Sequence, residues 1–287
     1  MYERYWELEG HPFDNGRDPR AWYPAPPHES ALLKLRYLIE RRKGAGLLTG
    51  DSGLGKSFLA SQLADRLGES HGPMVHLVYP RMSPAELFAY LAVALGAAPD
   101  SVGSETGGMD RTIRAIEGEL QRHETLGLHP VVLVDEAHLI DDVAVFQALR
   151  LLLNFQSDQG PLLSLILIGR QELGPRLSRL VEFDDRLAVK CPLRPLTAEE
   201  TADYVACRLN AAGARRPLFD ESALTALFEI SAGNPRRINR LCDMALLVGF
   251  ADEATMISAA QVSAVAEELA TGMDPPGRPR TRSSQAA

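Results

Sequence analysis

The residues whose types and spacing can do chemistry begin with Gly50–Ser57, which reads Gly-Asp-Ser-Gly-Leu-Gly-Lys-Ser. This stretch fits the phosphate-binding loop pattern G-x-x-x-x-G-K-[ST]. Glycines permit backbone turns that a β-carbon would forbid, so successive N–H groups can converge on phosphate oxygens. Lys56 can reach the β- and γ-phosphates of a nucleotide, and Ser57 can offer its hydroxyl to Mg²⁺. We therefore predict a nucleotide-binding loop made of Gly50, Asp51, Ser52, Gly53, Leu54, Gly55, Lys56 and Ser57.

A second candidate is an acidic pair, Asp135 and Glu136, which follows the apolar run 131–134. The carboxyl end of a parallel strand lies at the crevice where α/β sheets bind ligands. We predict that Asp135 and Ser57 hold Mg²⁺ and that Glu136 polarises the attacking water as general base. The alternative is a purely structural role, in which Asp135 only ends a strand and Glu136 caps a helix. The upstream phosphate loop favours the catalytic role. His138 is expected to be a surface residue or an indirect neighbour of the nucleotide.

The elements that must position these residues alternate between strands and helices. The apolar runs are continuous, as is typical of strands buried on both faces of a parallel sheet. Strands are expected at 46–49, 73–79, 131–135, 162–168 and 187–191. Helices are expected from about 32, after the phosphate loop, from Ser83, around 113–120 and over 142–156. The alternation predicts an α/β fold with a parallel five-stranded sheet, right-handed crossovers and helices on both faces.

The pattern changes near residues 193–196, where a domain boundary is predicted. From Thr197 to about 270 there are four helical stretches, the first opened by the capping-box sequence Thr-Ala-Glu-Glu. The predicted organisation is an N-terminal wrap and first helix, a phosphate-loop core, a small all-helical lid and a disordered tail with three arginines. These parts are placed at 1–45, 46–195, 196–270 and 271–287.

Composition restricts the class of protein. Hydrophobic residues make up 45% and charged residues 24% of the 287 residues, values that are ordinary for a soluble globular chain. The formal charge of −8 argues against a generally basic, nucleic-acid-coating surface, although a local basic patch is allowed. No apolar run approaches the roughly 18 residues of a membrane-spanning helix. Three widely spaced cysteines predict neither a disulfide framework nor a metal site, and they favour the cytoplasm.

Several short stretches in one order carry a family resemblance. They are Pro12-Phe13 with Asp18-Pro19-Arg20, then Gly50–Ser57, 133–138, 151–155, 167–173, 185–187 and the box 233–242, Gly-Asn-Pro-Arg-Arg-Ile-Asn-Arg-Leu-Cys. This set resembles the AAA+ ATPases, and more closely the bacterial ExeA-like secretion ATPases. That group is itself similar to TniB-type transposition ATPases and to archaeal replication initiators. The resemblance covers about residues 1–270 and implies an AAA+ sheet followed by a helical lid.

The resemblance also implies roles for four further positions. Arg186 lies where the family has an arginine finger that acts on a neighbouring subunit's nucleotide; the alternative is a surface salt bridge with Asp184, Asp185 or Glu182. Arg236 matches the sensor 2 arginine, with Arg237 as a competitor. At sensor 1 the family has glutamine after the glycine, whereas this chain has Arg170 there and Gln171 next.

Three functions follow as hypotheses. The first is ATP hydrolysis with Mg²⁺ by a homo-oligomer with shared sites, coupled to assembly or remodelling of an unidentified partner complex, such as secretion or pilus machinery. The second is a DNA-binding transposition or replication ATPase, which the acidic charge does not favour. The third is a nucleotide-gated scaffold with little turnover. A helicase is excluded because the chain has room for only one motor core. The larger ExeA-like proteins carry a transmembrane helix and a wall-binding module, which are not expected here.

Overall fold

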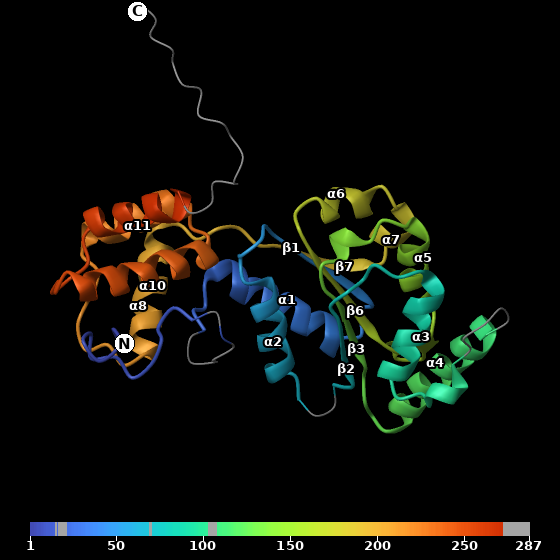
Figure 1. The fold of residues 1–287 in the computed structure, drawn as a ribbon. Coiled ribbons are helices and arrows are strands. Elements are labelled where there is room, and N and C mark those ends of the chain that lie inside the picture. The colour runs from blue at the N-terminus through green and yellow to red at the C-terminus, as the bar shows by residue number, and fades with distance from the viewer. Residues whose placement is uncertain (15, 17–21, 69–70, 103–107, 272–287) are drawn as a thin grey trace, which may run out of the picture. The chain divides into compact units, whose positions relative to one another are not determined.

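The computed structural model describes residues 1–14, 16, 22–68, 71–102 and 108–271. The chain divides into two compact units (Figure 1). One unit, here called the sheet unit, runs from Pro24 to Pro195. The other, here called the helical unit, combines Met1–Tyr23 with the chain from Leu196 onward.

The sheet unit is built on five parallel strands in the order β2-β3-β6-β1-β7. Their bounds are β1 Ala45–Thr49, β2 Met74–Leu77, β3 Val131–Val134, β6 Ser164–Gly169 and β7 Leu187–Pro192. Every residue of β1, β3 and β6 is buried, as their continuous apolar sequences predict. The predicted α/β class and the parallel five-stranded sheet are thus confirmed.

Helices cover both faces of this sheet. Figure 1 shows α1 and α2 on one side of the strands and α3, α4 and α5 on the other. The bounds are α1 Pro26–Glu40, α2 Lys56–Arg66, α3 Pro84–Ala94, α4 Gly108–Thr125, α5 Val143–Leu152, α6 Leu173–Ser178 and α7 Val181–Asp184. The predicted start of α3 is confirmed, because the Ser83 hydroxyl accepts the Glu86 N–H and the Glu86 carboxylate accepts the Ser83 N–H.

The end of α5 differs from the sequence prediction. The predicted helix continued to Gln156, whereas α5 ends at Leu152. Gln156–Ser157 (β4) instead pairs with Gly160–Pro161 (β5) in a short antiparallel hairpin. Gly160 has φ +111°, a conformation that favours glycine and permits this tight return of the chain.

The helical unit contains α8 Ala198–Ala211, α9 Glu221–Ser231, α10 Pro235–Ala251 and α11 Ala259–Thr271. α11 packs on α9 and α10, and α8 packs on α9. The predicted capping box is present at the start of α8, where Thr197 and Glu200 exchange hydrogen bonds. These helices form the all-helical region that the sequence predicts.

The N-terminal segment belongs to the helical unit. The Trp6 side chain is 2% exposed, and its indole N–H donates to the Leu246 carbonyl oxygen at 2.9 Å. The Arg208 Nε donates to the Pro12 carbonyl oxygen at 2.7 Å. The sequence predicts an N-terminal wrap and first helix over 1–45, but it does not indicate which helices bury the aromatic side chains of the wrap. In the structure the segment divides after Tyr23, and α1 joins the sheet unit.

Candidate nucleotide site

The phosphate loop connects β1, which ends at Thr49, to α2, which begins at Lys56. Gly53 and Gly55 have φ +87° and +85°, the left-handed region that side chains with a β-carbon rarely adopt. The Gly50 N–H donates to the Gly169 carbonyl oxygen at 3.2 Å, which ties the start of the loop to the end of β6. The loop therefore has the backbone conformation and the following helix that an anion site needs.

Lys56 lies inside this loop with only 8% of its surface exposed. Its Nζ donates to the carbonyl oxygens of Gly50 at 2.7 Å and Asp51 at 2.9 Å. Burial lowers the pKa of the ammonium, and the carboxylates of Glu136, Asp135 and Asp51 oppose that effect. The positive charge is thus placed among acidic neighbours at the N-terminus of α2.

Asp135 lies next to the phosphate loop. The Ser57 Oγ donates to Asp135 Oδ2 at 3.1 Å, and the Glu136 N–H donates to Oδ1 at 2.8 Å. The Nε2 of His76, on β2, lies 3.4 Å from Oδ2. Burial raises the pKa of Asp135, but the nearby His76 and the hydrogen bonds from Glu136 and Ser57 outweigh it and lower the pKa overall. Ser57 and Asp135 thus form a set of hard oxygen donors that fits Mg²⁺.

Glu136 follows with an unusual backbone. Its φ of +50° and ψ of 32° are left-handed values, which are uncommon for a residue other than glycine. Its side chain is 48% exposed, and Oε2 lies 3.2 Å from the Nδ1 of His138. Two histidines therefore contact the acidic pair, His76 at Asp135 and His138 at Glu136. No pattern in the sequence pointed to His76, because its contact depends on the pairing of β2 with β3.

The residues that follow β6 reach the phosphate loop. The Gln171 Nε2 donates to Asp51 Oδ2 at 3.3 Å. Arg170 is exposed, and its positive charge is one of the influences that lower the pKa of Lys56. Both candidates for sensor 1 thus act on loop residues, Gln171 by a hydrogen bond and Arg170 by its charge.

Arg186 lies at the amino ends of the parallel strands, whereas the phosphate loop lies at their carboxyl ends. It precedes Leu187, which pairs with Ala45 at the first residue of β1, while the loop follows Thr49 at the last. The five residues of β1, at about 3.3 Å each, separate its two ends by roughly 16 Å. The Arg186 Nη2 donates to the Asn154 side-chain oxygen at 3.1 Å. Arg186 is therefore not part of the site formed by its own chain's loop.

Two of the three acidic residues that were alternative partners of Arg186 pair with other cations. The Glu182 carboxylate pairs with Arg150 at 3.0 Å, and the Asp184 carboxylate pairs with Lys190 at 2.6 Å. Arg186 contacts the neutral amide of Asn154, and Asn154 belongs to one of the stretches that carried the family resemblance.

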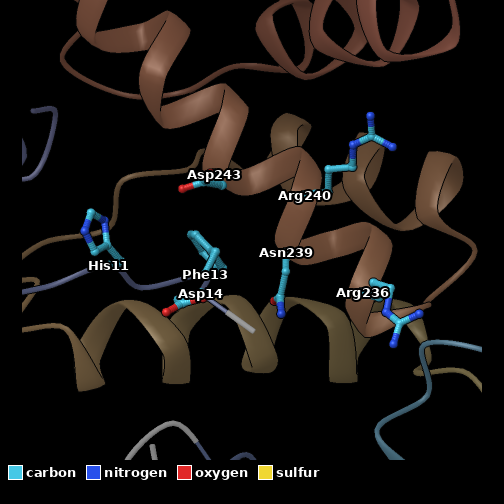
Figure 2. Close-up of a pocket in the computed structure, with 7 residues that line it drawn as sticks. All are labelled: His11, Phe13, Asp14, Arg236, Asn239, Arg240 and Asp243. Carbon is cyan, nitrogen blue, oxygen red and sulfur yellow. The ribbon is translucent and has the colours of Figure 1, made fainter. Parts of the chain in front are cut away.

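Arg236 lies in the first turn of α10, in the helical unit. The Asn234 side chain caps this helix by accepting the N–H groups of Arg236 and Arg237 at 3.1 and 3.3 Å, and Pro235 occupies the first position. Arg236 lines a pocket of about 570 Å³ (Figure 2). The other lining residues are His11, Phe13, Asp14, Asn239, Arg240 and Asp243. In Figure 2 the Phe13 ring lies between His11 and Asn239, so the segment that carries Pro12-Phe13 faces the same pocket as Arg236.

Two sequence predictions lie outside the described residues. They are the Asp18-Pro19-Arg20 stretch of the family resemblance and the disordered tail at 271–287, of which the structure describes only the backbone of Thr271. All three cysteines are described and are free thiols. The helices of the described part of the chain include none with the length and apolar character needed to cross a bilayer.

Comparison with known proteins agrees with this geometry. A family model described as an AAA domain matches residues 39–177. General secretion pathway protein A of Aeromonas hydrophila is 32% identical over 272 residues, which is 94% of this chain and 48% of that protein. The chain thus spans about half the length of the curated relative that it matches.

Solved structures show the same fold. The Aeropyrum pernix ORC1 protein, determined in complex with DNA, aligns with a TM-score of 0.60 at 17% identity, covering 86% of this chain and 65% of that one. CDC6P of Pyrobaculum aerophilum aligns with a TM-score of 0.66 at 14% identity, covering 90% and 70%. The chain therefore carries an AAA domain over residues 39–177 and is similar to general secretion pathway protein A.

Proposed function

We propose that this protein binds ATP with Mg²⁺ and hydrolyses it to ADP and phosphate. The observation that carries the proposal is the cluster in which Lys56, Ser57 and Asp135 meet at the carboxyl edge of the sheet, with Glu136 adjacent. The loop N–H groups and Lys56 bind the phosphates, and Ser57 and Asp135 hold Mg²⁺. Bound Mg²⁺ neutralises phosphate charge. Glu136 orients and polarises the attacking water.

We infer that the arginines complete the site in an oligomer. Arg186 acts on the nucleotide of a neighbouring subunit, because it lies at the end of the strands opposite to its own phosphate loop. Arg236, or Arg237 beside it, serves as sensor 2, and Arg170 or Gln171 serves as sensor 1. Gln171 is supported by its hydrogen bond to Asp51, and Arg236 by its place in the first turn of α10.

The cycle is proposed to couple to assembly or remodelling of a protein complex. The relative's name, general secretion pathway protein A, supports a secretion or pilus machine. DNA is the alternative partner, supported by the likeness in fold to an ORC1 protein solved with DNA and by Arg236, Arg237 and Arg240 on α10. DNA retention that weakens steeply as salt rises would favour this alternative.

The test compares wild type with Lys56→Ala and Glu136→Gln in nucleotide binding and in turnover. Lys56→Ala is expected to lose nucleotide binding. Glu136→Gln is expected to bind ATP normally and to hydrolyse it about 10²- to 10⁴-fold more slowly, because it lacks the base. Glu117→Gln, an exposed change on α4, is the matched control and should behave as wild type.

Normal turnover in Glu136→Gln would contradict the assignment of the base. Normal nucleotide binding by Lys56→Ala would contradict the site itself. If wild type bound ATP but turned over no faster than Glu136→Gln, the chain would be a nucleotide-gated scaffold instead.

A further inference from the structure

The contact between His138 and Glu136 has no role in the chemistry described so far. His138 lies in the single turn Ala137–Leu139 that follows the acidic pair. Its side chain is only 7% exposed, while the Glu136 side chain is 48% exposed. The Nδ1 of His138 lies 3.2 Å from Glu136 Oε2, and it forms no hydrogen bond within the described residues. A buried ring nitrogen thus lies beside the exposed carboxylate of the proposed base.

The ring of His138 is held in place by the end of β6. A β-carbon on Gly169 would lie 3.5 Å from Nδ1, 3.2 Å from the His138 backbone nitrogen and 2.7 Å from Leu173 Cδ2. A side chain at Gly169 would therefore force Leu173 and the turn to shift. The carbonyl oxygen of Gly169 also accepts the Gly50 N–H of the phosphate loop. The ring consequently rests on the same residue that anchors the loop.

Arg176 fixes the other side of the turn. Its Nη1 donates to the His138 carbonyl oxygen at 3.4 Å, and its Nη2 donates to the Asp141 carbonyl oxygen at 2.9 Å. Its guanidinium lies 5.1 Å from the centre of the Phe146 ring. The backbone of His138 is therefore held by α6 and the core, which leaves the imidazole little freedom to move.

We propose that His138 is a positioning residue for the hydrolysis, donating from Nδ1–H to Glu136 and so fixing the carboxylate that polarises the water. The inference rests on the proposed role of Glu136. A general base must be within about 2.6–3.2 Å of the water in the correct orientation, and a misplacement of 1 Å can cost about 100-fold in rate. The Glu136 side chain is exposed, so a rigidly held His138 can supply the orientation that the base needs.

The test replaces His138 by two neutral amide side chains of different length, asparagine and glutamine. In His138→Asn the amide nitrogen can occupy the place of Nδ1, whereas in His138→Gln it reaches the place of Nε2. The rate of a single turnover at saturating ATP is expected to fall about 10- to 100-fold in His138→Gln and in His138→Leu, while His138→Asn stays near wild type. ATP affinity is expected to be unchanged in all three variants, so the loss lies in kcat alone.

A double-mutant cycle separates this inference from the proposed function. In a Glu136→Gln background, His138→Gln is expected to cause no further loss, since there is no carboxylate to position. If Glu136→Gln itself retains turnover, the proposed base and the inference both fail. If Glu136→Gln is inactive but His138→Gln hydrolyses ATP at the wild-type rate or faster, only the inference fails.

Two further outcomes would also overturn the proposed positioning role of His138. Equal losses in His138→Asn and His138→Gln would show that the Nδ1 position carries no special role. Loss of ATP binding in both amide variants would show that His138 supports the loop structurally. Should His138→Leu fail to fold, the two amides still decide the question.

Discussion

At the scale of single residues, the phosphate loop depends on backbone conformations that only a few side chains tolerate. Gly53 and Gly55 both have positive φ, and Gly55 directly precedes α2. A β-carbon on Gly55 would also lie 3.4 Å from the His28 Nε2, which bonds the Leu54 carbonyl oxygen. The loop therefore has a conformational requirement at Gly55 that is separate from the charge of Lys56.

Gly55→Ala is expected to destabilise the protein by about 1–2 kcal/mol, because a left-handed conformation costs that much for a residue with a β-carbon. Nucleotide binding should weaken with it, since the loop must leave its anion-binding shape to relieve the strain. The matched control is Gly118→Ala on α4, where nothing lies within 4 Å and alanine should stabilise the helix by about 0.5–1 kcal/mol. Thermal unfolding and nucleotide titration measure both variants, and equal unfolding temperatures would contradict the expectation.

At the scale of elements, β3 and β6 are joined at their starts by a buried side-chain pair. The Nε2 of His129 lies 2.9 Å from the Ser164 Oγ, and Ser164 is the first residue of β6. Burial lowers the pKa of His129 to about 4, assisted by the positive charges of Arg42 and His71. The folded protein therefore holds this imidazole neutral at the base of the two strands that carry the site.

Because the folded pKa of His129 is depressed, its neutral form stabilises the fold fully above the unfolded value near 6.5. That contribution is lost as the pH falls from about 6.5 to about 4, and it amounts to roughly 3 kcal/mol at most. Urea unfolding of wild type should show this loss, and His129→Gln should unfold with a flatter pH dependence over the same window. Parallel pH profiles for the two proteins would contradict the assignment.

The elements were largely predictable, because their signals are local. The apolar runs of β3 and β6 and the capping residues of α3 and α8 act over a few positions, and the structure follows them. The closeness of Ser57 to Asp135 was also predictable, because each follows a parallel strand at the carboxyl end of the sheet. The contacts of His76 and His138 were not predictable, because they depend on how β2 and β6 lie beside β3. The short α5 also escaped prediction, since the hairpin that ends it competes with helical propensity.

At the scale of the whole molecule, the proposed role of Arg186 predicts that two chains share each site. Arg186→Ala is expected to reduce ATP turnover by about 10³-fold or more, which is the loss expected when an arginine finger is removed. Mixing it with inactive Lys56→Ala should restore part of the activity, because mixed assemblies contain sites with an intact loop and an intact finger. Arg179→Ala, an exposed change at the end of α6, should retain activity and serves as the control. Absence of recovery in the mixture, despite proven mixed assemblies, would count against a shared site.

The divided helical unit has a consequence for synthesis. Trp6 is buried against Leu246, and 240 positions of chain separate the two residues. A chain that emerges from the ribosome N-terminus first therefore exposes Trp6 until α10 has been made, while the whole sheet unit lies between them and can fold earlier. The aromatic N-terminal segment consequently finds its partners only after the whole sheet unit has been made. For that interval, this segment is the natural target for a chaperone.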